Sequence, residues 1–258
     1  MPNTSLHPNI LFHFTNKQAL FGILSSNFRV SYARENIRGP KEKKEFGVPM
    51  VSFCDLKLSE LENFINEEGY GKYGIGVTKS CANRNNLNPV MYINKHCSIT
   101  DDLINGIDGI FRHLDNLDNH DDIDNLSANY NNIINLYRYI KNYEGDLKRR
   151  GKPIIKNYRF ADDREWRYVP DINTTGIKAF VPISEMDTSE KKRLLNASVQ
   201  HLTLHFTPED IKYLIIKDED EIVELMDHLE KVKNKYDLDT RRRLSSRILT
   251  IEQIQNDI

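Results

Sequence analysis

Short apolar runs separated by polar residues dominate the first hundred positions, a spacing typical of β-strands. Residues 10–14 form a compact apolar run, and residues 28–32 alternate aromatic or branched residues with polar ones. Between these runs, apolar residues recur every three or four positions. That spacing predicts a helix that begins after Thr15, a candidate N-cap, and ends at Asn27.

The rest of the first hundred residues continues the strand pattern, with one charged segment that interrupts it. Residues 34–47 carry Lys and Glu around a Gly-Pro pair, which favours a mobile surface loop. A strand resumes at residues 48–54, and a helix is expected near residues 58–67. Residues 70–77 and 89–93 are short and rich in β-branched or aromatic residues, as in two further strands.

The periodicity changes in residues 100–150, where apolar residues recur at steps of three or four. This spacing predicts a helical hairpin turned by residues 118–124. Because it interrupts a strand-rich chain, we expect it to project from the sheet as a platform for a partner or substrate. Covering one face of the sheet is the alternative. The positions that carry the period are Leu103, Ile107, Ile110, Leu114, Leu117, Leu126, Tyr130, Ile133, Tyr137, Ile140 and Leu147.

Strand patterns return in the last hundred residues, with two helices among them. The expected strands are 158–160, 165–169, 179–183, 201–206, 213–216 and 246–251, and the expected helices are 190–199 and 221–232. Thr207, Pro208 and Asp210 predict a brief helical turn, and the polar residues 237–243 separate the last helix from the last strand. Without regular βαβ alternation, the chain is predicted to be a single α+β domain over residues 1–258.

Composition removes several classes of function. The 258 residues carry a formal charge of −2, so no global attraction to nucleic acid or an anionic membrane is expected. No apolar stretch approaches the roughly 18 residues of a membrane span, and the first residues lack a signal-peptide layout, which predicts a cytoplasmic protein without membrane contact. Three cysteines without a Cys-x-x-Cys pair favour reduced thiols.

Common catalytic and metal motifs are missing from the sequence. It contains no phosphate-binding loop, dinucleotide fingerprint, serine-hydrolase elbow or zinc-protease helix. The acidic tract around His120 lacks the glycine and closing glutamate of a calcium loop, so we expect no metal. The basic groups at 148–152 and 241–243 favour solvated charge over phosphate contact, because no nucleic-acid reading motif accompanies them.

Two places depart from ordinary packing. His13 and Thr15 lie two residues apart and share one face of a strand with a buried pattern. Glu165 interrupts another strand suited to burial, where a carboxylate is costly unless it is paired or functional. A hydrogen-bonded core histidine and an ion-paired glutamate are the alternative interpretations.

Sequence blocks around these residues resemble two families. His13-Phe14-Thr15, residues 21–24, residues 28–30 and the Val-Pro strand at 48–55 resemble the opening of the ADP-ribosyltransferase superfamily, most closely its DNA-modifying DarT branch. Nearly the whole chain, including residues 88–90 and 164–170, also resembles the bacterial AbiGi family of abortive phage-resistance proteins, labelled antitoxins. The transferase resemblance implies a split mixed sheet with the helical hairpin inserted in it.

The transferase resemblance also implies NAD as a substrate and assigns roles to residues. Glu165 would be the catalytic carboxylate, gripping a ribose hydroxyl and stabilising the ribosyl cation. His13 and Thr15 would contact the adenosine ribose, and the backbone of Phe14 would hold the nicotinamide carboxamide. The residues expected to bind NAD are His13, Phe14, Thr15, Ser52, Phe53 and Tyr32.

The sequence departs from the transferase pattern at the stacking residue and near the glutamate. Ser52-Phe53 replaces the usual stacking tyrosine, so the stacking role passes to Phe53 or to a tyrosine; the tyrosine candidates are Tyr32, Tyr70 and Tyr73. Arg167 lies two residues after Glu165, where a Glu-x-Glu motif would have a second glutamate. The lack of that motif argues against arginine as the acceptor of ADP-ribose. Arg34 and Arg159 are the candidate arginines near NAD.

Two functions remain open. One is an NAD-dependent mono-ADP-ribosyltransferase of a phage-defence system that modifies a nucleic acid or protein. The other is a non-catalytic antitoxin that neutralises a partner toxin. For the enzyme, Glu165 must lie on the same side of the sheet as His13, with both residues around one cleft. Glu165→Gln should then keep the fold and abolish NAD-dependent activity.

Overall fold

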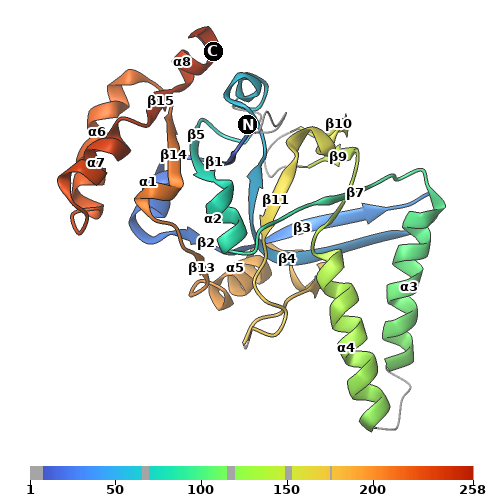
Figure 1. The fold of residues 1–258 in the computed structure, drawn as a ribbon. Coiled ribbons are helices and arrows are strands. Elements are labelled where there is room, and N and C mark those ends of the chain that lie inside the picture. Colours follow the sequence, from blue (N-terminus) through green and yellow to red (C-terminus); the bar gives the residue numbers. More distant parts are fainter. Residues whose placement is uncertain (1–7, 66–69, 115–119, 149–152, 175, 258) are drawn as a thin grey trace, which may run out of the picture.

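A long mixed β-sheet runs through the centre of the molecule in the computed structural model, which describes residues 8–65, 70–114, 120–148, 153–174 and 176–257 (Figure 1). Within these residues the sheet has nine strands, and β14 and β15 are parallel while the other neighbours pair antiparallel. Along its main path the order is β15 (Ile248–Thr250), β14 (Ile211–Ile216), β5 (Tyr73–Thr78), β1 (Ile10–Thr15), β4 (Lys43–Cys54), β11 (Glu165–Tyr168) and β6 (Asn88–Pro89); β3 (Ser31–Arg38) and β12 (Val181–Pro182) also pair with β4.

Short strand pairs and helices complete the α+β fold, which confirms the predicted class. The pairs are β9 (Gly145–Leu147) with β10 (Ile155–Tyr158), β2 (Phe28–Arg29) with β13 (Thr203–Leu204), and β7 (Met91–Ile93) with β8 (Ile140–Asn142). The α-helices are α1 (Lys17–Ser26), α2 (Lys79–Arg84), α3 (Ser98–Leu114), α4 (His120–Tyr137), α5 (Ser189–Ser198), α6 (Ile222–Val232), α7 (Leu238–Ser245) and α8 (Ile251–Asp257). Single turns of 3-10 helix are η1 (Leu58–Asn63), η2 (Phe160–Asp163), η3 (Ile183–Glu185), η4 (Pro208–Asp210) and η5 (Glu219–Glu221).

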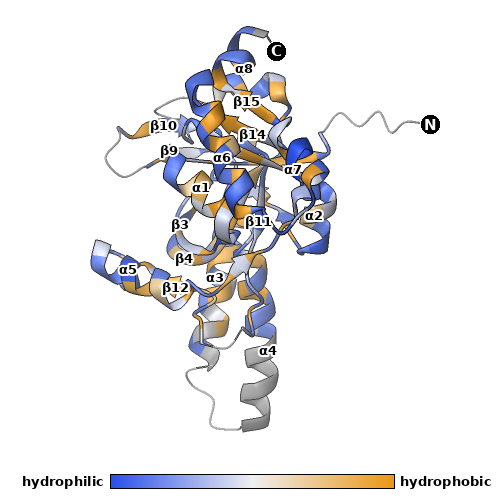
Figure 2. Cartoon of the chain, turned by 90° about the vertical axis from the view of Figure 1, so that its left-hand side faces the viewer, coloured by the Kyte–Doolittle hydropathy of each residue, from blue (hydrophilic) through white to orange (hydrophobic). Residues whose placement is uncertain are grey.

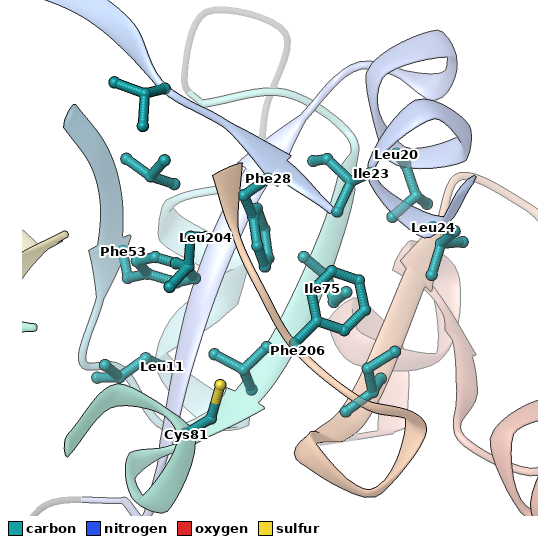
Figure 3. Close-up of a cluster of buried hydrophobic side chains, with 14 of the residues drawn as sticks. Leu11, Leu20, Ile23, Leu24, Phe28, Phe53, Ile75, Cys81, Leu204 and Phe206 are labelled. Atoms are coloured by element: carbon teal, nitrogen blue, oxygen red, sulfur yellow. The ribbon is translucent and has the colours of Figure 1, made fainter. Parts of the chain in front are cut away.

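Strand β4 contributes to every large hydrophobic cluster formed by the described residues. Phe46, Val48 and Met50 pack with the base of the α3–α4 hairpin, whereas Phe53 packs under α1. Cys54, at the end of the strand, belongs to a third cluster on the other face. Figure 3 shows part of the cluster under α1, whose labelled residues are Leu11, Leu20, Ile23, Leu24, Phe28, Phe53, Ile75, Cys81, Leu204 and Phe206.

Strands β1 and β4 meet over a short stretch and then separate. Within these two fully described strands, Phe12 opposite Cys54 is the one paired position, whereas β1 pairs with β5 along its whole length. The N-terminal half of β4 instead pairs with β3 from Ser31–Met50 to Arg38–Lys43. The sheet therefore splits open between β1 and β4.

Helices α3 and α4 occupy most of the segment that was predicted to be a helical hairpin. The base of the α3–α4 hairpin buries Ile104, Ile107, Ile134 and Tyr137 against β3 and β4, and α3 and α4 extend away from the sheet in Figure 1. Figure 2 shows the base of the hairpin below the sheet from the side. The prediction was wrong in its limits. Helix α4 already begins at His120, inside the expected turn, and the chain after Tyr137 forms β8 and β9; residues 115–119 lie outside the described part.

The largest error of the sequence analysis is the expected loop at residues 34–47. Strand β3 runs to Arg38 and β4 starts at Lys43, so most of this segment is an antiparallel ladder. Ile37 and Phe46 are completely buried, whereas Arg38 and Lys43 are exposed. Two buried anchors therefore outweigh the high local charge.

The ends of the chain's helices also differ from expectation. Asn16, rather than Thr15, caps α1 and accepts a hydrogen bond from the backbone of Ala19 at 2.9 Å. The polar segment expected as a link at 237–243 is mostly helix α7, which Asp237 caps. Helices α2 and α8 were not predicted.

The structure also bears on membrane contact and on the thiols. None of the helices within the described part of the chain has the length and apolar character required to cross a membrane. Cys54 and Cys81 are buried and Cys97 is exposed, and within the described residues none of the three forms a disulfide.

Candidate functional site

A cavity of about 840 Å³ lies where β1 and β4 separate. Its volume falls within the roughly 300–1,000 Å³ of small-molecule pockets. Most of the residues proposed to bind NAD line it: His13, Phe14, Thr15, Ser52 and Phe53, together with Glu165. The split of the sheet therefore brings together three separate parts of the sequence.

His13 bridges the gap between the two diverging strands. Its Nδ1 lies 2.8 Å from the carbonyl oxygen of Ser52, and because a carbonyl can only accept, Nδ1 carries the proton. The ring packs against Phe28 and Phe53, with centroids 5.2 and 5.6 Å away. Burial lowers the pKa of His13 below its ordinary value, while the bond to Ser52 opposes that shift. His13 is therefore a neutral ring whose Nε2 is an acceptor.

The expectation that His13 and Glu165 share one face of the sheet is wrong. Phe12 lies opposite Cys54, and Cys54 lies opposite Glu165, so these three side chains share a face. His13 follows Phe12 and points to the other face, where it meets Phe53. Both residues still line the cavity, because the strands part there and the opening is reached from both faces.

Glu165 is buried, and both of its oxygens accept hydrogen bonds from cations. Its Oε1 accepts from Nε of Arg167 at 2.7 Å, and its Oε2 accepts from Lys141 Nζ at 2.7 Å and from Nη2 of Arg167 at 3.3 Å. Glu165 is 6% exposed and Arg167 is completely buried. The carboxylate therefore exists as the centre of an ion-pair network.

The network continues through Arg167 to a second buried carboxylate. Nη2 of Arg167 donates to Oε1 of Glu35 at 2.8 Å, and Nη1 donates to the carbonyl of Arg138 at 2.8 Å. Glu35 on β3 and Lys141 on β8 also line the cavity. Two carboxylates and two cations thus balance, which satisfies the requirement that buried charges be paired.

The charges set the ionisation of Glu165. Burial alone would raise the pKa of this carboxyl, but Arg167 and Lys141 outweigh burial and hold the pKa far below its usual range. Likewise, Glu165 keeps the pKa of Lys141 above its ordinary value despite the burial of the amine. Glu165, Lys141 and Arg167 are therefore charged at neutral pH.

A second carboxylate beside the cavity is held by tyrosines. Asp163 accepts from the hydroxyl groups of Tyr70 and of Tyr158, the latter at 2.6 Å. Burial raises the pKa of Asp163, and the two hydroxyl donors oppose that rise. Tyr70 and Asp163 both line the cavity, whose polar wall therefore combines carboxylates, an amine and a phenol.

Several proposed residues lie elsewhere. Tyr32 is buried away from the cavity lining and donates its hydroxyl to the Lys178 carbonyl at 2.6 Å. Tyr73 donates to Glu221, and neither Tyr73 nor the two candidate arginines, Arg34 and Arg159, line the cavity. Tyr70 does line it, and so does Arg29, an arginine that the sequence analysis did not consider.

Lys141 and Glu35, two members of the ion-pair network, were not predicted as site residues. Lys141 was assigned to the helical hairpin, and Glu35 to the charged loop. The aromatic and β-branched residues around Lys141, namely Tyr139, Ile140 and Tyr143, favour a strand, but the helical period concealed this signal.

The basic groups take different positions. On α7, Arg241 pairs with Glu230, and Arg242 and Arg243, in the last turn, are exposed. This agrees with helix-end charge. Lys148 is exposed, and residues 149–152 of the other group lie outside the described part of the chain.

The arrangement is suited to binding more than to proton transfer. His13 offers an acceptor, Thr15 and Ser52 offer hydroxyls, and Phe14 and Phe53 offer apolar surface. Within the described residues, no group of three or more His, Cys, Asp or Glu side chains is placed to hold a metal ion. Three of the roughly four acceptor sites of the Glu165 carboxylate are used by its cations, and the remaining one lies on Oε1.

The fold and the site define the protein as an α+β protein with a ligand-sized cavity in a split sheet. The chain matches the AbiGi family, abortive phage-resistance proteins labelled antitoxins, over residues 26–217, and it belongs to that family. A relative named abortive phage resistance protein AbiGi, from Lactococcus lactis subsp. cremoris, is 26% identical over 185 residues, which cover 67% of this chain and 73% of the relative. No solved structure matches the chain.

Proposed function

We propose that the protein acts by binding, as a non-catalytic antitoxin that neutralises a partner toxin in an abortive phage-resistance system. The observation that carries this proposal is the state of Glu165, whose two oxygens are both held by buried cations. A carboxylate that stabilises a ribosyl cation must face the substrate with its charge available. The antitoxin label of the family supports the same conclusion.

The α3–α4 hairpin is the surface proposed to bind the toxin. Residues 98–137 contain eight aspartates and one arginine, although the whole chain is nearly neutral. An acidic arm that extends from the body complements a basic partner and accelerates its association. Asp102, which is exposed on α3, belongs to this surface.

Co-expression tests the proposal. The product of each gene flanking that of the antitoxin is expressed alone and together with the protein in a bacterial host, and growth and co-purification are scored. A toxin should arrest growth alone, and the protein should restore growth and bind it in a fixed ratio. Asp102→Lys should weaken the complex, whereas Glu190→Lys, an exposed reversal on α5, should not. Failure of every pair to show rescue and complex formation would contradict the proposal.

The second candidate is NAD-dependent ADP-ribosyl transfer to a nucleic acid or protein. It is favoured by the cavity, which gathers His13, Phe14, Thr15 and Phe53 near Glu165. Purified protein incubated with labelled NAD and total nucleic acid or lysate tests it. Transfer of label by the unmodified chain would establish catalysis and overturn the non-catalytic proposal. Its loss in Glu165→Gln, with retention in the surface control Glu185→Gln, assigns the catalytic role to Glu165 only where circular dichroism shows that the Glu165→Gln protein is folded.

A further inference from the structure

A second cavity, of about 660 Å³, lies at the other end of the sheet from the split between β1 and β4. It is bounded by residues at the start of β1, the end of β5, the start of β14 and the start of β15. The described residues that line it include Lys79, Lys212 and Arg247, and no carboxylate is among them. Cations gathered at a cavity without acidic residues produce a local positive potential in a chain of net charge −2.

Lys212 and Arg247 carry this potential, because Lys79 is already paired. Nζ of Lys79 lies 2.7 Å from Asp55, so its charge is balanced. Lys212 makes no ion pair with any residue that the structure describes. The nearby carboxylate of Asp210, on η4, is held by Arg84 at 2.7 Å and does not line the cavity.

Arg247 is fixed in position by neutral acceptors. Its Nη1 donates to the carbonyl of Pro208 at 2.9 Å and to that of Ile211. In the described part of the chain, these carbonyls are the acceptors of its guanidinium, which leaves Nε and Nη2 to another ligand. A guanidinium oriented in this way can bind a phosphate through two parallel hydrogen bonds without losing much side-chain freedom.

The rest of the lining suits the remainder of a nucleotide. Ser80 and Ser246 supply hydroxyls, and Ile10, Tyr213 and Leu249 supply apolar surface. A phosphate alone would leave most of this cavity unfilled, whereas a base and a sugar would cover the apolar part.

We propose that this cavity binds the phosphate of a nucleotide, with Lys212 and Arg247 as its ligands. The phosphate comes either from a free nucleotide or from a nucleic-acid strand. This site is separate from the cavity that contains His13 and Glu165, and it holds whether or not the protein is an antitoxin.

Calorimetric titration of the full-length protein at low salt tests the site, with inorganic phosphate, AMP and a single-stranded oligonucleotide as separate probes. At least one probe should bind saturably with one site per chain. Lys212→Gln should weaken its binding about tenfold or more, the loss expected for a charge-assisted hydrogen bond. Lys231→Gln removes the same charge from an exposed position on α6 outside the cavity and should change the affinity less than about twofold.

The probes also identify the source of the phosphate. Saturation by AMP with an affinity equal to or above that of the oligonucleotide assigns a free nucleotide, and the reverse order assigns a strand. Arg247→Lys should bind the same probe more weakly while its melting temperature reports any loss of the carbonyl contacts. Absence of saturable binding by all three probes up to about 1 mM, or equal losses in Lys212→Gln and Lys231→Gln, overturns the proposal.

Discussion

The burial of the Glu165 carboxylate is explained by the charged residues around it. Removing it from water is unfavourable, and three hydrogen bonds to Arg167 and Lys141 offset that cost. The arrangement also needs Glu35, because Arg167 and Lys141 together carry one more charge than Glu165 can balance. The four residues therefore form one unit whose members stabilise one another.

Glu165→Gln is expected to destabilise the fold, which replaces the expectation from the sequence that the fold would be unaffected. The change leaves Arg167 and Lys141 facing a neutral amide in a buried site, and breaking such a pair costs about 3–5 kcal/mol. Urea unfolding followed by circular dichroism measures this loss of the free energy of unfolding.

Glu185→Gln is the matched control for that measurement. Glu185 forms an exposed ion pair with Lys178, and its loss should cost about 1 kcal/mol or less. Equal stability of the Glu165→Gln protein and the unmodified chain would show that the network is not a structural unit.

His13 should make stability depend on pH in the mildly acidic range. Because burial lowers the pKa of His13 below its unfolded value of about 6.5, the unfolded chain takes up a proton first as the pH falls. Above that pH, both states are neutral and His13 contributes no pH dependence. Below it, the free energy of unfolding falls by at most about 1.4 kcal/mol per pH unit, until the folded-state pKa is passed.

His13→Asn should flatten this dependence, since the amide can still donate to Ser52 but does not titrate. Urea unfolding between pH 5 and 8 measures the slope, and His201→Asn, at an exposed position, is the control. A slope that is the same in all three proteins would show that His13 is not the titrating group.

The sequence predicts the local parts of the site but not its connections. The spacing of His13 and Thr15 and the isolation of Glu165 in an apolar strand both select residues that line the cavity. The pairing of Glu165 could not be predicted, because Lys141 lies 24 positions away and Glu35 on a strand read as a loop. Such long-range contacts depend on strand order, which local patterns do not encode.

The two ends of the hairpin differ in their environment. Its base packs on β3 and β4, and its far end extends from the molecule (Figure 1). Ile107 is buried in the cluster shared with β4, whereas Ile99, in the first turn of the same helix, is 62% exposed. The two isoleucines therefore allow a buried position and an exposed position on one helix to be compared.

Ile107→Ala should destabilise the protein by about 2–5 kcal/mol, because it opens a cavity in the cluster shared with β4. Ile99→Ala should change the free energy of unfolding by less than about 0.5 kcal/mol. Urea unfolding measures both. Equal effects would mean that the base of the hairpin does not pack on the sheet.

Errors at the level of elements have a common physical cause. Periodicity predicts helices and strands with apolar faces, such as α1, α6 and β1, which the structure confirms. It fails at β3 and α7, whose residues are mostly polar and whose formation depends on a few buried anchors. In α7 the anchors are Thr240 and Leu244, with Asp237 capping the first turn.

At the scale of the whole molecule, strand β4 joins parts of the core that would otherwise be independent. The cluster under the hairpin, the cluster under α1 and the cluster on the opposite face each include residues of this one strand. Twelve consecutive residues, Lys43–Cys54, therefore connect the three. Loss of any one cluster removes packing from a strand that the other two require.

The chain should consequently unfold in one cooperative transition rather than in separate steps. Trp166, the one tryptophan, packs on the cluster under α1, so its fluorescence reports that cluster, whereas circular dichroism reports all helices. The two signals should change at the same urea concentration. Ile107→Ala, although it lies in the cluster under the hairpin, should move both midpoints together to lower urea, because β4 transmits the loss. A fluorescence midpoint that stays in place while the circular dichroism midpoint falls would show instead that the hairpin cluster unfolds on its own.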